Sequence, residues 1–175
     1  MTDDEFIHLM QNRIAELAVS PSAVRNQGPP GIAKAARDAL KDFDPREFRT
    51  RTKKEFNEKL RQATYTLKNK LPADARHWGT ARKLLNLFLR DILYNRYLCE
   101  HFKFKRIEKW LEVPLDSETA QGIKSAIPPH CLPRWPGIKY LKTHESKCFQ
   151  KAAFWIARQQ GKARIHLDLL YWRNR

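Results

Sequence analysis

The chain has 175 residues, and its 34 Lys and Arg against 19 Asp and Glu give a formal net charge of +15. This length is enough for one domain, or two small lobes, with a hydrophobic core that needs no disulfide or metal support. The charge predicts a polyanionic partner, foremost nucleic acid, and no apolar run approaches the roughly 20 residues that cross a membrane.

Apolar residues at helical spacing predict helices through the N-terminal half of the chain. The first begins at Thr2 with acidic residues in its first turn, and this acidic start is unlike a signal or transit peptide. A second helix is expected from Pro30, because proline suits the first turn of a helix. Asp44 and Pro45 provide a cap and a first-turn proline for a third helix that runs to Leu71.

A long helix is predicted over residues 76–100, and it is apolar on nearly every side, so we expect it at the centre of the core. Further helices are expected, in chain order, over residues 105–111, 117–126 and 143–160, and from Leu169 onward. The chain has no pattern typical of a sheet, so the predicted fold class is all-α in a single compact domain, residues 1–175. Two lobes within it would comprise residues 1–71 and residues 72–175.

The three cysteines, at positions 99, 131 and 148, are odd in number and widely spaced. We expect them to be reduced thiols in a cytoplasmic protein. Zinc ribbons and iron–sulfur clusters need clustered thiolates, so the sequence predicts no metal site and no cofactor.

The positive charge is concentrated toward the C-terminus. Residues 134–175 contain ten Lys and Arg against two acids, Glu145 and Asp168. A carboxylate repels phosphates, so Asp168 in a DNA-binding segment calls for an explanation. It could stabilise a positively charged sugar transition state or orient an attacking water. Alternatively it caps the last helix, or forms an ion pair with Arg164 or Arg173.

The order of features before Asp168 resembles the helix–hairpin–helix DNA glycosylase superfamily. Four features come in the family's order: the Leu132-Pro133 pair at the start of a hairpin, Lys147 in the following helix, Gly161 at its end, and an apolar stretch before Asp168. This resemblance implies a glycosylase-like fold with Asp168 as the catalytic carboxylate. Lys147 stands nearest the lysine that adds lyase activity in some members. The implied reaction cuts a damaged or modified base, for example a phage-modified one, from its sugar without metal or cofactor.

The loop before this helix has the residue types of a nucleic-acid contact. Arg134, Lys139 and Lys142 can bind phosphates, and Trp135 can stack on an unstacked base or wedge beside it. Packing of Trp135 in the core explains its presence equally well. Arg164 and Arg173 are further candidates for phosphate contacts, with DNA expected as the partner ahead of RNA, and no membrane.

A second polar loop precedes the helix expected from Pro30. Arg25, Asn26 and Gln27 carry many hydrogen-bond donors beside a helix N-terminus, which suits an anion, and Asn and Gln can read a base edge. An ordinary polar loop accounts for the same residues.

Polar side chains also interrupt the long central helix. Asp91, Tyr94 and Asn95 stand on an otherwise apolar element, and buried polar side chains must be paired. They therefore form either a structural network or the wall of a pocket.

Two other functions fit the sequence. Arg96 and His101 form the Arg-x4-His pattern that is typical of the all-α HEPN ribonucleases, so an RNA-cutting enzyme is one alternative. The other is a nucleic-acid-binding protein without catalysis, in which Asp168 is a helix cap. The sequence leaves the oligomeric state open.

Overall fold

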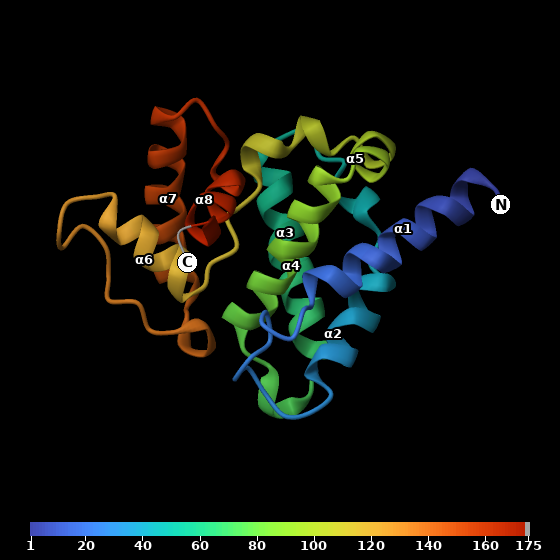
Figure 1. The fold of residues 1–175 in the computed structure, drawn as a ribbon, viewed down its shortest axis with the longest axis horizontal. Coiled ribbons are helices and arrows are strands. Elements are labelled where there is room, and N and C mark those ends of the chain that lie inside the picture. The colour runs from blue at the N-terminus through green and yellow to red at the C-terminus, as the bar shows by residue number, and fades with distance from the viewer. Residues whose placement is uncertain (174–175) are drawn as a thin grey trace.

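The computed structural model describes the backbone of residues 1–173 and the side chains of residues 1–171. This part of the chain forms eight α-helices, joined by loops and short 3-10 turns, and no strand, which confirms the all-α class (Figure 1). The helices are α1 (Asp3–Ala18), α2 (Ile32–Lys41), α3 (Lys53–Lys70), α4 (Trp78–Tyr94), α5 (Arg96–Phe102), α6 (Ser117–Ser125), α7 (Thr143–Gln159) and α8 (Leu167–Arg173). The 3-10 turns are η1 (Pro45–Phe48), η2 (Ala73–Ala75), η3 (Phe104–Arg106), η4 (Glu108–Trp110), η5 (Ile138–Tyr140) and η6 (Arg164–His166).

Side-chain caps determine where the first helices begin. α1 begins after Thr2, the start that the sequence predicts, and Thr2 and Glu5 form a capping box there. The predicted start of α3 is wrong, because a separate short turn occupies the predicted position. Asp44 and Pro45 begin only the 3-10 turn η1, and α3 starts after Thr52, whose hydroxyl accepts a hydrogen bond from the Glu55 backbone N–H.

The helix expected from Pro30 begins later than predicted. Pro30 lies before α2, whose N-cap is Gly31 in the left-handed region at φ 96°. Glycine adopts this conformation without the clash that a Cβ would cause, so the chain turns into the helix here rather than at the proline.

The long helix predicted over residues 76–100 is two helices. Asn95 has extended backbone dihedral angles and separates α4 from α5. Its Oδ1 accepts a hydrogen bond from the Leu98 backbone N–H at 3.0 Å, so Asn95 caps α5 instead of continuing α4. The predicted helix over residues 105–111 is replaced by the 3-10 turns η3 and η4.

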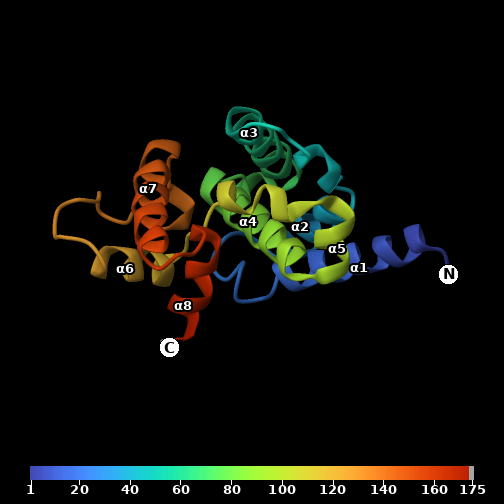
Figure 2. The same ribbon diagram turned by 90° about the horizontal axis from the view of Figure 1, so that it is seen from above.

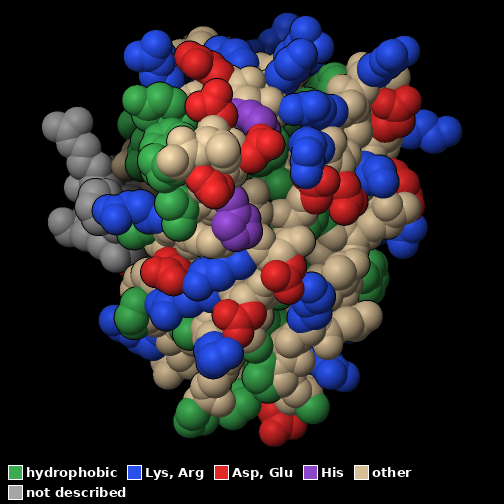
Figure 3. All heavy atoms as spheres, turned by 90° about the vertical axis from the view of Figure 1, so that its right-hand side faces the viewer, with side chains coloured by type: hydrophobic (Ala, Val, Ile, Leu, Met, Phe, Trp, Pro, Cys, Tyr) green, Lys and Arg blue, Asp and Glu red, His purple; other side chains and the backbone are tan. Residues whose placement is uncertain are grey.

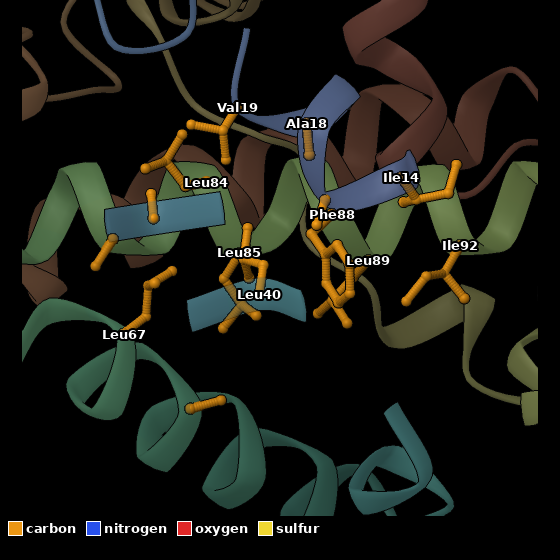
Figure 4. Close-up of a cluster of buried hydrophobic side chains, with 14 of the residues drawn as sticks. Ile14, Ala18, Val19, Leu40, Leu67, Leu84, Leu85, Phe88, Leu89 and Ile92 are labelled. Atoms are coloured by element: carbon orange, nitrogen blue, oxygen red, sulfur yellow. The ribbon is translucent and has the colours of Figure 1, made fainter. Parts of the chain in front are cut away.

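The predicted central position of α4 is confirmed. Its apolar side chains pack among those of α1, α2 and α3 (Figure 4). The fully buried residues of α4 in this cluster are Ala81, Leu84, Leu85, Phe88, Leu89 and Ile92.

Two clusters of buried apolar side chains divide the molecule. The first includes residues 14–111 and the second residues 113–167, so we call residues 1–111 the N-terminal lobe and residues 113–173 the C-terminal lobe. In Figure 1, α6, α7 and α8 gather on the left, and α1 to α5 occupy the centre and right. The division does not fall after Leu71, because α3 and α4 pack against each other within the first cluster. Ile165 belongs to the first cluster and so ties η6 to the N-terminal lobe.

The excess of positive charge is not gathered on the face where α1 and α5 lie. Figure 3 shows Lys and Arg interspersed with Asp and Glu over that face. Of the helices within residues 1–173, none combines the length and the apolar composition that crossing a membrane requires.

Candidate nucleic-acid interface

A groove of about 890 Å³ lies between α3 of the N-terminal lobe and α7 of the C-terminal lobe. In Figure 2, α7 stands in the lobe on the left and α3 at the top of the other lobe. Of the 15 described residues that line the groove, eight are Lys or Arg and two are Glu. The basic residues are Lys53, Lys54, Arg61, Arg82, Lys109, Lys147, Lys151 and Arg164.

Helical periodicity builds both walls of the groove. On α3, Lys53, Asn57 and Arg61 recur every four residues and line the groove, while Phe56 and Leu60 are buried in the core. On α7 the corresponding stripe is Thr143, Lys147, Lys151 and Phe154, and the core takes Phe149, Ala153 and Ile156. Each wall is therefore the solvent-facing stripe of an amphipathic helix.

The two glutamates of the groove are paired with arginines, and they lower the formal charge of its lining residues from +8 to +6. Glu58 accepts hydrogen bonds from Arg61 Nη2 at 2.6 Å and from Gln62 Nε2 at 2.8 Å. The bond from Arg61 lowers the pKa of Glu58. Glu112 lies deeper, with its Oε2 at 3.7 Å from Arg82 Nε and 3.4 Å from Asn86 Nδ2.

Arg164 is a structural residue of the groove floor. Its guanidinium donates hydrogen bonds to the carbonyl oxygens of Trp110 at 2.8 Å, Leu111 at 2.9 Å and Gln150 at 3.3 Å. These bonds join η6 to α7 and to the end of the N-terminal lobe. The sequence predicts a phosphate contact for Arg164, but its N–H groups donate to backbone carbonyls instead.

Arg82 also lies at the floor of the groove. Its Nη1 donates to the Leu60 carbonyl at 3.1 Å, and its guanidinium lies over the Trp78 ring at 5.0 Å from the centroid. Its Nε is buried and makes no hydrogen bond among the described residues, but it faces Glu112 Oε2 at the ion-pair distance of 3.7 Å. Arg82 is 9% exposed, and burial lowers the pKa of its guanidinium. In the sequence Arg82 is one of several polar residues on an otherwise apolar helix, and nothing near it along the chain shows what faces it.

Asp168 lies outside this groove, in the first turn of α8, and forms an ion pair with Arg90 of α4. Arg90 also binds Asp91, with Nη2 and Nε at 2.7 Å and 2.8 Å from Asp91 Oδ1. Burial raises the pKa of Asp91 and of Asp168, and it outweighs Arg90, which lowers the pKa of both carboxyls. The ion pair predicted with Arg164 is not formed, and Asp168 lies within α8 rather than at its cap. The predicted pairing with Arg173 concerns a side chain outside the described part of the structure.

A buried lysine extends this cluster toward α6. Lys83 donates a hydrogen bond to the Ala23 carbonyl at 3.3 Å and lies 3.7 Å from Asp116 Oδ2. Burial lowers the pKa of Lys83. Asp116 in turn caps α6 by accepting a hydrogen bond from the Thr119 backbone N–H at 2.9 Å.

Tyr94 and His166 close the other end of the cluster. The Tyr94 hydroxyl lies 2.9 Å from His166 Nδ1, and His166 Nε2 lies 2.8 Å from Glu108 Oε1. The two rings are stacked, with centroids 5.6 Å apart. Burial raises the pKa of Tyr94 to about 12. The structure thus brings Asp91, Tyr94 and Asp168 into one polar cluster between the lobes, whereas Asn95 is a helix cap.

Lys147, the proposed lyase residue, lies apart from Asp168. It is exposed on α7 and lines the basic groove, while Asp168 faces α4. The two residues that the family resemblance combines in one active site are therefore in different places in this structure.

The loop before α7 holds its tryptophan in place. Trp135 is half-buried, its Nε1 donates to Ser117 Oγ at 3.2 Å, and its ring meets Phe149 edge-on at 5.3 Å. These contacts favour the alternative in which Trp135 packs within the protein over the one in which it wedges beside a base. Arg134 and Lys142 are exposed and Lys139 is half-exposed, so all three remain open to a phosphate.

The loop at residues 25–27 is anchored by its glutamine. Gln27 is buried, accepts a hydrogen bond from Thr80 Oγ1 at 3.0 Å, and donates one to the Arg25 carbonyl at 3.1 Å. Its amide is therefore engaged within the protein. Arg25 and Asn26 are exposed.

The residues of the ribonuclease alternative have other contacts. Arg96 lies 3.4 Å from Glu100 on the exposed side of α5. The His101 ring meets Phe102 edge-on at 4.8 Å. For a metal, the described residues contain no group of three or more His, Cys, Asp or Glu side chains that could hold one.

Comparison with known proteins adds no relative to this geometry. No protein-family model, curated protein or solved structure matches the chain. The likeness to helix–hairpin–helix glycosylases accordingly remains a prediction from the sequence.

Proposed function

We propose that the protein binds nucleic acid in the groove between α3 and α7. The observation that carries this proposal is the set of eight Lys and Arg that line one concavity from both lobes. Closely spaced cations of this kind repel one another in the free protein and are stabilised by a polyanion that enters between them.

The shape of the charged surface favours a chain-like polyanion over a membrane. A bilayer is broad and reaches only the rims of a concave surface, whereas a phosphodiester backbone can run along the floor. Lys53 and Lys54 on one wall and Lys147 and Lys151 on the other can then contact phosphates together.

Charge reversal on one wall tests this function. Lys147→Glu combined with Lys151→Glu is expected to weaken binding of labelled DNA and RNA at least about tenfold, measured by fluorescence anisotropy. The matched control is Lys124→Glu combined with Lys162→Glu, which changes the net charge equally in the same lobe but outside the groove. An equal loss in both variants, or no loss in the first, contradicts the proposal.

A second candidate function is the excision of a base by Asp168, in a glycosylase-like fold. The observation in its favour is the polar cluster that places Asp168 beside Asp91, between the lobes. Arg90 holds the carboxylate, so a substrate would have to displace this ion pair before Asp168 could stabilise a sugar cation.

Base release is a direct test of the second function. The protein is incubated with DNA that carries varied modified bases, and mass spectrometry detects free base or abasic sites. Release that disappears in Asp168→Asn is the expected result for this mechanism, and release retained by that variant rules it out. Cutting of RNA that disappears in His101→Ala would instead favour the ribonuclease.

A further inference from the structure

The basic groove has one aromatic side chain on its wall that the core does not use. Phe154 lines the groove and is 38% exposed, although Phe149, five positions earlier on α7, is fully buried. The Phe154 ring meets the neighbouring Trp155 ring edge-on at 5.7 Å, and its exposed part offers a flat face to a partner. Proteins that bind single strands combine a basic groove with such faces, on which bases stack.

We infer that the groove binds a single strand of nucleic acid rather than a duplex, with a base stacked on Phe154. This inference rests on the proposed function of the groove and names its substrate. The shared chemistry is a phosphodiester chain with unpaired bases, which either DNA or RNA provides.

The concave shape supports a single strand. Proteins that read a duplex insert a protruding helix or ribbon into its major groove, which is about 12 Å wide. Here the cations line the inside of a groove whose volume, about 890 Å³, is that of a pocket for a compact ligand. A duplex would rest on the rims, whereas an unpaired strand can enter.

Phe154→Ala tests the stacking contact, and Tyr140→Ala is its matched control. Tyr140, in η5 of the same lobe, is more exposed, at 72%, and is not part of the groove wall. The probes are a short labelled single strand, as DNA and as RNA, and the duplex of the same sequence. Anisotropy titrations of the whole chain give the affinity for each probe, and circular dichroism checks that both variants fold.

We expect the unaltered protein to bind either single strand more tightly than the duplex. Phe154→Ala should weaken single-strand binding by roughly five- to 150-fold, the range for the loss of one stacked base. Phe154→Tyr should restore binding, and Tyr140→Ala should change it less than twofold. Tighter binding of the duplex, or equal affinities of Phe154→Ala and the unaltered protein for the single strands, overturns the inference.

These outcomes are separable from a failure of the proposed function. If Lys147→Glu with Lys151→Glu weakens all probes and Phe154→Ala weakens none, the groove binds nucleic acid but not by stacking. If the charge reversal leaves every affinity unchanged, the groove itself is the wrong site.

Discussion

At the scale of single residues, Arg90 is shared between two acids. It lies between Asp91 of its own helix and Asp168 of α8, and all three side chains are largely removed from water. A buried ion pair contributes little net stability, because desolvation of the charges offsets their attraction. We therefore interpret Arg90 as the residue that positions α8 against α4, rather than as a main source of stability.

Asp168→Asn should change how stability depends on pH. Burial raises the pKa of Asp168 above its ordinary value of 3.8, so between these two values the folded protein holds a proton that the unfolded chain has released. The contribution of Asp168 to the free energy of unfolding is then fully present below pH 3.8 and falls as the pH rises through the folded pKa. Relative to Asp168→Asn, the unaltered protein should lose about 1.4 kcal/mol per unit of pKa shift.

Urea unfolding of both proteins from acidic to neutral pH measures this difference. Asp38→Asn is a control of opposite sign, because the hydrogen bond from Lys34 lowers the pKa of Asp38. An advantage of the unaltered protein over Asp168→Asn that grows with pH would show that Arg90 outweighs burial.

At the scale of elements, Gly79 lets the segment with η5 lie directly against the first turn of α4. A Cβ at this position would stand 2.1 Å from the Ile138 carbonyl oxygen and 2.9 Å from Leu141 Cβ. The first of these atoms is backbone, so the clash cannot be relieved by a side-chain rotation. Glycine at position 79 thus fixes how the C-terminal lobe meets the central helix.

Gly79→Ala is expected to lower the free energy of unfolding by about 1–3 kcal/mol, because an overpacked contact forces the backbone apart. Chemical denaturation measures the loss, and hydrogen exchange should show faster exchange in η5. Gly31→Ala is the comparison. Its Cβ meets nothing within 4 Å, and only the left-handed backbone, at a cost of about 1–2 kcal/mol, opposes it. A loss for Gly79→Ala well below about 1 kcal/mol, or unchanged exchange in η5, would contradict this account.

At the scale of the whole molecule, the two lobes contribute opposite walls of one charged groove. Lys53 and Lys54 come from α3, and Lys147 and Lys151 from α7, so neither lobe carries the full set. The affinity for nucleic acid should therefore depend on the two lobes keeping their relative position.

The salt dependence of binding measures how many of these cations meet phosphates. If about four lysines displace counterions from a single strand, the logarithm of the association constant should fall against that of the salt concentration with a slope of about −3. Lys147→Glu with Lys151→Glu should reduce this slope to roughly half. A slope near zero in the unaltered protein would mean that binding is not electrostatic.

Much of the fold could be predicted from the sequence, because helices and caps depend on near neighbours. The capping box at Thr2, the apolar surround of α4 and the end of α7 before Gly161 are all readable from residues a few positions apart. The errors at Asp44 and Asn95 are of the same local kind. Asp44 looked like the cap of α3, but Thr52 caps that helix. Asn95 looked like a residue inside one long helix, but its side chain caps α5.

The sequence by itself thus determined that the protein is all-α, strongly basic, and most basic in its C-terminal third. It also marked Asp168 as an acid in a basic segment that calls for an explanation. Only the tertiary structure paired Asp168 with Arg90, engaged the donors of Arg164 with backbone carbonyls, and combined α3 and α7 into one groove. The physical reason is distance along the chain: cations that line this groove come from segments far apart in sequence, and only the packing of the two lobes sets them face to face.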